Sequence, residues 1–339
     1  MKQTKLCVFG GAFDPPHLGH MNIVKSVRAI IKPDKVLIIP TGSAPHKTTA
    51  TPYNVRFKLA EAAFPDCEIS DIENHPSASY TIDTIRKLKT NYPPDTKIFL
   101  IIGSDMLLNF DKWKDYKQIL ELCTVIAAAR DSSDYGEYAV RLGIRLVELP
   151  VVEMSSSQIR EKFKPKRYIH SINVAVMCGT LSRKYKLSAE ISKKVYIAGI
   201  LHDIMKKSDI VPNYTEYEPT SEELAEPKLW HAISGAKYVR DVLGISDTDI
   251  ADAIRFHTVG RPKMSMVEKI VYIADKISEE RDYKGVEEIR TLAFENLDLA
   301  VYTSLKSSLK KTIKKDKQIP PYTINAYHYY QRLLKGVQK

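Results

Sequence analysis

Residues 10–20 read GGAFDPPHLGH and follow a short apolar run, Leu6–Phe9. The apolar run predicts a strand, and Gly10 and Gly11 allow the backbone to approach a ligand closely. An apolar-periodic helix begins after the prolines. His17 and His20 share one face of its first turn, where N–H groups and the positive end of the helix dipole attract anions. The segment therefore predicts a phosphate-binding strand, loop and helix start.

Two common phosphate motifs do not match this segment. Its glycine spacing differs from G-x-G-x-x-G, and it lacks the Gly-Lys-Ser/Thr ending of the P-loop. Capping of the helix is the alternative role for the two histidines.

Strand and helix patterns alternate up to about residue 160. This alternation predicts an α/β domain with a Rossmann-like parallel sheet and with ligands at the carboxyl ends of its strands. The strand candidates are Leu6–Phe9, Val36–Ile39, Ile98–Ile102, Val125–Ala129 and Arg145–Leu149, and the helix candidates are Gly19–Ile31, Pro52–Ala63, Ile82–Asn91 and Tyr116–Leu122.

Helical periodicity replaces the strand signal from about residue 165. The join, residues 161–167, is short, charged and interrupted by a proline. We therefore expect an α/β domain over residues 1–163 and an all-α domain over residues 164–339. The helix candidates of the second half are Tyr168–Tyr185, Ser188–Ile204, Trp230–Leu243, Asp247–His257, Met266–Ile277 and Leu297–Lys315.

The composition is typical of a globular protein, with 44% hydrophobic and 27% charged residues among 339. The four cysteines form no C-x-x-C pair, which favours reduced thiols in a cytoplasmic protein. No apolar stretch approaches the roughly 20 residues that span a membrane. The sequence does not determine the oligomeric state.

The net charge of +10 is unevenly distributed, with +2 on residues 1–160 and +8 on residues 161–339. A positive balance suits anionic nucleotides as well as nucleic acid. Much of the excess lies on one side of a predicted helix between residues 306 and 317, which we interpret as a solvated face. No aromatic residues interleave with this stripe in sequence, which argues against nucleic acid as a partner.

Four further strings occur in order after the opening motif: PHK at 45–47, SYTIDT at 79–84, GSD at 103–105 with WK at 113–114, and SSSQIR at 155–160. With residues 10–20, they resemble the nicotinate-mononucleotide adenylyltransferases, nucleotidyltransferases with a Rossmann-like fold. Ala12 departs from the threonine that is frequent in this family.

This resemblance implies adenylyl transfer from ATP, with magnesium arriving on the nucleotide. It assigns catalytic phosphate contacts to His17, His20 and Arg160, and substrate contacts to Gly10, Gly11, Lys47, Ser156 and Ser157. It also implies that Thr81 and Trp113 hold the nicotinate end and that Asp105 contacts the ribose side. Taken singly, Trp113 could equally be a core residue.

The helical half contains histidines and aspartates that are candidate metal ligands. His202 and Asp203 are adjacent at the end of an apolar helix pattern, and imidazoles and carboxylates from several helices can meet in a bundle core. The histidines and aspartates at positions 170, 202, 203, 231, 257 and 275 resemble those of the HD phosphohydrolase superfamily, in particular of its symmetrical diadenosine tetraphosphate hydrolases. The resemblance implies a di-metal centre, iron or manganese, with Asp203 also catalytic. The implied metal ligands are His170, His202, Asp203, His231, His257 and Asp275, and the implied phosphate contacts are Lys206, Arg261 and Arg281.

The expected partners are thus ATP, nicotinate mononucleotide and dinucleoside polyphosphates. One rival hypothesis keeps both folds and changes the substrates, with nicotinamide mononucleotide or a pantetheine phosphate as acceptor and other nucleotides for the helical domain. A second rival is a nucleotide-sensing or RNA-binding module with degenerate catalytic sites.

Overall fold

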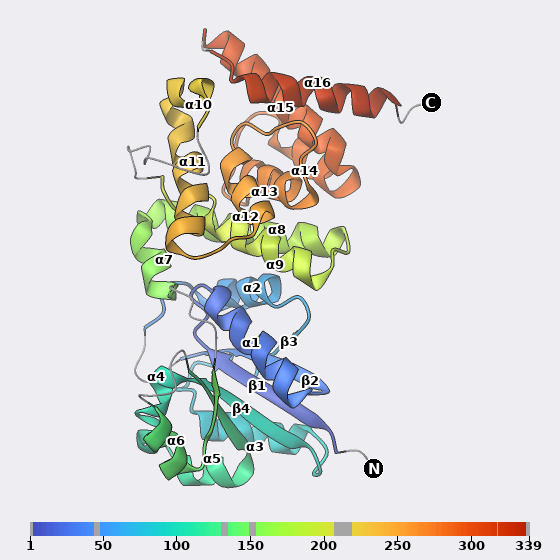
Figure 1. Cartoon of the computed structure of the whole chain (residues 1–339). Coiled ribbons are helices and arrows are strands. Elements are labelled where there is room, and N and C mark those ends of the chain that lie inside the picture. The colour runs from blue at the N-terminus through green and yellow to red at the C-terminus, as the bar shows by residue number, and fades with distance from the viewer. Residues whose placement is uncertain are drawn as a thin grey trace. The chain divides into compact units, whose positions relative to one another are not determined.

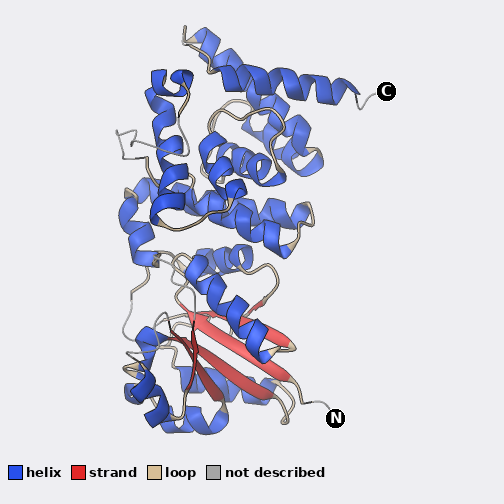
Figure 2. Cartoon of the chain, in the orientation of Figure 1, coloured by secondary structure: helices blue, strands red, loops and turns tan. Residues whose placement is uncertain are grey.

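The computed structural model of this chain describes residues 3–43, 48–129, 135–148, 154–206, 219–316 and 318–336. These residues form two compact units, Met1–Ser156 and Ser157–Lys339. All strands of the described chain lie in the first unit, and the second is helical (Figure 2). No helix in the described parts is both long and apolar enough to cross a bilayer.

A six-stranded parallel sheet, in the order β3-β2-β1-β4-β5-β6, forms the centre of the first unit. The strand order reverses between β1 and β4, which is where doubly wound sheets bind ligands. This confirms the predicted parallel α/β architecture. The strands are β1 (Lys5–Gly11), β2 (Lys35–Pro40), β3 (Glu68–Ile69), β4 (Lys97–Gly103), β5 (Thr124–Ala129) and β6 (Arg145–Glu148).

Apolar side chains on both faces of the sheet are covered by helices (Figure 1). Leu6 and Val8 of β1 belong to a core cluster with residues of α3 and α5, whereas α1 buries Met21 and Val24 in the same unit. The helices are α1 (Leu18–Ile31), α2 (Tyr53–Ala63), α3 (Thr81–Asn91), α4 (Ser104–Leu107), α5 (Tyr116–Leu122) and α6 (Gly136–Leu142), with a 3-10 turn η1 at Phe110–Lys112.

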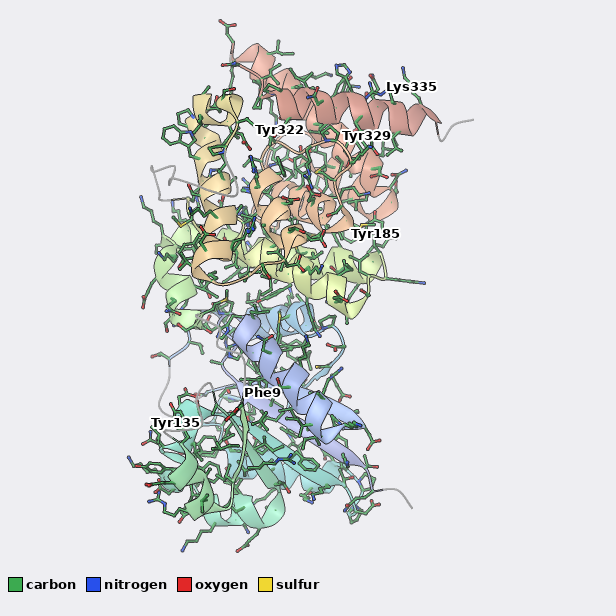
Figure 3. The ribbon with its side chains drawn as sticks, viewed as in Figure 1. Phe9, Tyr135, Tyr185, Tyr322, Tyr329 and Lys335 are labelled. Atoms are coloured by element: carbon green, nitrogen blue, oxygen red, sulfur yellow. The ribbon has the colours of Figure 1, made fainter. Side chains whose placement is uncertain are left out.

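The second unit is a helical bundle in which α8 and α9 pack together and α13 packs against both. The Tyr185 hydroxyl, labelled in Figure 3, donates to the carbonyl of Ala293 at 2.8 Å and ties α8 to α14. The helices are α7 (Ser156–Lys162), α8 (Pro165–Lys184), α9 (Ala189–Leu201), α10 (Ser221–Ala225), α11 (Trp230–Lys237), α12 (Thr248–Phe256), α13 (Met266–Ile277), α14 (Val286–Glu295), α15 (Leu297–Lys314) and α16 (Pro321–Gly336), with a 3-10 turn η2 at Pro227–Leu229.

One predicted helix differs from the structure. The pattern over Trp230–Leu243 predicts a single α-helix, but α11 ends at Lys237 and continues as a π-helical segment, η3, over Tyr238–Val242. The apolar spacing cannot reveal the change, because one π turn shifts the register by a single residue.

Candidate functional site

The first candidate site lies at the carboxyl end of β1. His17 is the N-cap of α1, and His20 is the third residue of that helix. The backbone N–H of His17 donates to Nδ1 of His20 at 3.2 Å, which leaves the proton of a neutral His20 on Nε2. The two rings lie 3.8 Å apart between centroids. His20 therefore presents an N–H donor, as phosphate binding requires.

Aromatic rings and a glycine shape the surroundings of these histidines. The ring of Phe9, labelled in Figure 3, lies 6.1 Å from that of His20, and Phe13 lies 5.2 Å from it. A Cβ at Gly19 would lie 3.0 Å from the His17 imidazole, so this position has little room for a side chain.

Arg56 holds the loop between β1 and α1 from inside the protein. It is 1% exposed, and its guanidinium donates to the carbonyls of Thr51 at 3.1 Å and Ala12 at 2.7 Å. Asp14 in the same loop accepts a 2.6 Å hydrogen bond from the Ala50 N–H. Sequence reasoning missed Arg56, because a lone arginine within a helical pattern ordinarily indicates a solvent-facing position.

Residues expected to bind the acceptor follow β3 and β4. Thr81 begins α3, and Asp105 is exposed in α4 directly after β4. Trp113 is half-buried, with its ring 5.1 Å from that of Phe110. Asp105 therefore flanks the point of strand reversal beside β1.

The serine-rich string divides between the two compact units. The Ser156 hydroxyl donates to the carbonyl of Pro15 at 2.9 Å and so reaches the loop of His17. Ser157 and Arg160 lie on α7, where the Arg160 guanidinium donates to the Ser157 hydroxyl at 3.0 Å. Gly10 and Gly11 end β1. Lys47 lies outside the described residues.

The second candidate site is a buried cluster of imidazoles and carboxylates in the helical unit. Two groups meet there: His170, His202 and Asp203, and Asp203, His231 and His257, each with its ligand atoms within 4.8 Å of one another. Asp203 belongs to both groups. Asp275 of α13 joins the first group, with Oδ1 lying 3.0 Å from Nε2 of His170.

Hydrogen bonds on the far side of three imidazoles orient them toward this cluster. Nδ1 of His202 and of His257 donates to the carbonyls of Gly199 and Ile254, each at 2.7 Å. Nδ1 of His170 donates to the carboxylate of Glu280. In the neutral form of each ring, Nδ1 carries the proton and an unprotonated Nε2 faces the cluster, as metal ligation requires. Burial lowers the pKa of His170, but its hydrogen bonds to Asp275 and Glu280 outweigh burial and raise that pKa.

Charge states in the cluster also suit a metal. Burial lowers the pKa of His202 to about 3 and that of His231 to about 4, so both are neutral at pH 7. Burial raises the pKa of Asp203, but the surrounding imidazoles of His202, His231 and His257 outweigh it and hold that pKa far below its usual range. Neutral imidazoles and ionised carboxylates are the metal-binding forms.

The surroundings of one carboxylate oxygen indicate whether a divalent ion fits this site. Oδ1 of Asp203 is buried, and no donor among the described residues meets it with hydrogen-bond geometry. The Nε2 atoms of His231 and His257 lie 3.2 and 3.5 Å from it. The Lys206 ammonium also lies 3.3 Å from this oxygen, so the cation requirement alone does not decide the question. The donor set, a buried carboxylate oxygen facing imidazole nitrogens, fits a divalent metal.

Basic side chains border the cluster. Lys206 Nζ lies 2.8 Å from Nε2 of His231, and a guanidinium nitrogen of Arg281 lies 3.3 Å from Nε2 of His170. Arg167, which sequence reasoning missed, reaches Asp203 at 3.4 Å. Arg261 instead donates to Glu268 and Asp252, which hold its guanidinium.

Comparison with known proteins gives two family matches. Residues 8–162 match the cytidylyltransferase-like family, and residues 167–280 match the HD domain family. A probable nicotinate-nucleotide adenylyltransferase/Ap4A hydrolase of Mycoplasma genitalium is 27% identical over 90% of this chain and 98% of its own length. A symmetrical bis(5'-nucleosyl)-tetraphosphatase of Bacillus subtilis is 35% identical, covering 50% of this chain and 92% of its own length. A probable nicotinate-nucleotide adenylyltransferase of Oceanobacillus iheyensis is 34% identical, covering 48% of this chain and 85% of its own length.

Proposed function

The chain belongs to the cytidylyltransferase-like family over residues 8–162 and to the HD domain family over residues 167–280, and we propose that it is a bifunctional enzyme. The first domain, residues 1–163, transfers the adenylyl group of ATP to nicotinate mononucleotide, giving nicotinate adenine dinucleotide and pyrophosphate. The second, residues 164–339, hydrolyses diadenosine tetraphosphate to two ADP. The reduced cysteines favour a cytoplasmic location.

Adenylyl transfer is mainly a matter of positioning and of neutralising phosphate charge. The mononucleotide phosphate attacks the α-phosphorus of Mg²⁺-bound ATP, and pyrophosphate leaves on the opposite side. Nε2–H of His20, with His17, donates to the ATP phosphates, and Arg56 keeps their loop in place. Ser156, Ser157, Arg160 and Lys47 add phosphate contacts, Gly10 and Gly11 leave room for the nucleotide, Thr81 and Trp113 hold the pyridine, and Asp105 contacts the ribose.

In the helical domain, a di-metal centre would be held by His170, His202, Asp203, His231, His257 and Asp275. An imidazole-rich set of this kind suits iron or manganese. Bound there, the ions supply Lewis acidity and lower the pKa of water, which makes hydroxide available at neutral pH. Lys206 and Arg281 border the cluster and neutralise the tetraphosphate; Arg261, held by two carboxylates, is the weakest phosphate candidate.

The observation that carries this proposal is the position of Asp203 between two groups of buried imidazoles, in a chain that also matches the cytidylyltransferase-like family. It is tested by assaying full-length protein with ATP plus nicotinate mononucleotide and, separately, with diadenosine tetraphosphate. Nicotinamide mononucleotide, pantetheine phosphate and other nucleotides serve as comparison substrates. We expect turnover in both assays; purified protein without metal and without either activity would instead indicate a sensing module.

A further inference from the structure

The turn after α13 carries a carboxylate that the proposed mechanism does not use. Oε1 of Glu280 accepts a hydrogen bond from Nδ1 of His170, which lies 110 positions earlier on α8. Oε2 accepts a 2.7 Å bond from the side-chain amide of Asn173, and the Ser278 hydroxyl donates to Oε1 at 2.8 Å. Both carboxylate oxygens are therefore engaged, although the side chain is 34% exposed.

We propose that Glu280 is a positioning residue for metal binding in the helical domain. This inference rests on the metal centre of the proposed function. A carboxylate that accepts the Nδ1–H of an imidazole fixes its tautomer and ring orientation and makes the other nitrogen a stronger ligand. Because Glu280 lies on the Nδ1 side of the ring and the cluster on the Nε2 side, it acts through His170 and is not itself a ligand.

The main chain around Glu280 is held in place by α14. The Arg290 guanidinium donates to the carbonyls of Ile277 at 3.2 Å, Ser278 at 3.0 Å and Arg281 at 2.8 Å. The turn that carries Glu280 is thus fixed independently of His170. A fixed acceptor orients its donor more strongly than a mobile one, since the entropy of ordering it is already lost on folding.

His170 differs in this respect from two other imidazoles of the cluster. His202 and His257 donate to carbonyls three residues earlier in their own helices. The acceptor for His170 is instead an anionic side chain from a distant segment. A hydrogen bond to a charged acceptor is roughly twice as strong as one between neutral groups, so His170 gains more ligand strength from its partner than His202 or His257 does.

A titration of metal-free, full-length protein with Mn²⁺, followed by calorimetry and by metal content, tests this role. We expect Glu280→Ala to weaken Mn²⁺ binding by up to about 100-fold, the upper range for outer ligand partners. Glu280→Gln keeps an acceptor without the charge, so we expect a smaller loss of about 10-fold. Glu279→Gln removes the same charge from the exposed neighbouring residue and should leave affinity unchanged.

Thermal unfolding of each metal-free variant serves as the folding control for the helical unit. Adenylyl transfer with Mg²⁺-ATP, which uses none of these residues, is the control for the first unit. The proposal is overturned if both Glu280 variants bind Mn²⁺ as the wild type does, or if Glu279→Gln weakens binding equally. Wild-type protein that takes up no Mn²⁺ would overturn the metal centre itself, and this inference with it. The two failures are therefore distinguishable.

Discussion

His20 of the first unit and two histidines of the helical unit, His202 and His257, are held in opposite tautomers. In the first unit, Nδ1 of His20 accepts a hydrogen bond from backbone, so the proton of the neutral ring is on Nε2. In the helical unit, Nδ1 of His202 and of His257 donates to backbone carbonyls, so Nε2 carries a lone pair. Under the proposed function, one backbone contact per ring separates a phosphate donor from a metal ligand.

Burial separates His20 from the helical histidines, although His17 beside it is only 7% exposed. His20 is partly exposed at the start of α1, where a nucleotide can reach it. His202 is fully buried and contacts other titratable groups only inside the cluster. A donor to a diffusing substrate must remain accessible, whereas a ligand to a resident ion gains from exclusion of water. Under the proposed function, the same type of side chain takes two roles that its surroundings set.

Removal of metal should produce the largest difference between the activities of the two sites. After dialysis against a strong chelator and return to buffer with Mg²⁺, we expect full adenylyl transfer and no tetraphosphate hydrolysis. Mg²⁺ prefers oxygen ligands, so it should not restore an imidazole-rich site, whereas Mn²⁺ should. Restoration of hydrolysis by Mg²⁺ alone would contradict the assignment of the helical histidines.

A pair of reciprocal substitutions should separate the two sites. Loss of one donor to a developing anion costs about 10²–10³ in rate, so His17→Ala should reduce adenylyl transfer by that factor. His202→Ala should reduce hydrolysis by more than about 100-fold, because a ligand matters more than its outer partner. Steady-state assays of both activities on each variant check this; a crossed effect would argue against independent sites.

Amide substitutions can test the tautomers directly. The side-chain NH₂ of glutamine can replace the Nε2–H of His20, whereas that of asparagine lies nearer Nδ1. We therefore expect His20→Gln to retain about ten times more transferase activity than His20→Asn, the value of about one hydrogen bond. Equal activities would show that the Nε2–H donor is not what the reaction uses.

The smallest effect that we expect is on the KM for the acceptor, nicotinate mononucleotide. Stacking of an aromatic pair contributes about 0.5–1.5 kcal/mol, so Trp113→Ala should raise the KM for nicotinate mononucleotide by roughly 2- to 10-fold and leave that for ATP unchanged. Trp113→Phe should recover most of the loss. Equal changes for both substrates would instead indicate a core role beside Phe110.

Much of the fold follows from local apolar patterns. The runs at β1, β2, β4 and β5 are buried strands because each is apolar on both faces, as a covered parallel sheet requires. The edge strand β6 buries only Val147. The two-residue strand β3 and the helices α14 and α16 were not predicted. β3 is too short to show the apolar–polar alternation that identifies a strand. α16 buries only three residues, so its apolar stripe is sparse.

Sequence by itself determined which residue types are available and in what order: histidines after a glycine loop, a His-Asp pair closing a helix, and a serine-rich string. These signals are local, because each depends on neighbours within one or two turns. Tertiary structure alone decided that Asp203 lies between two imidazole groups, that Arg56 supports the loop of His17, and that Glu280 orients His170. Those contacts join segments far apart in the chain, and no local pattern encodes which distant groups folding brings together.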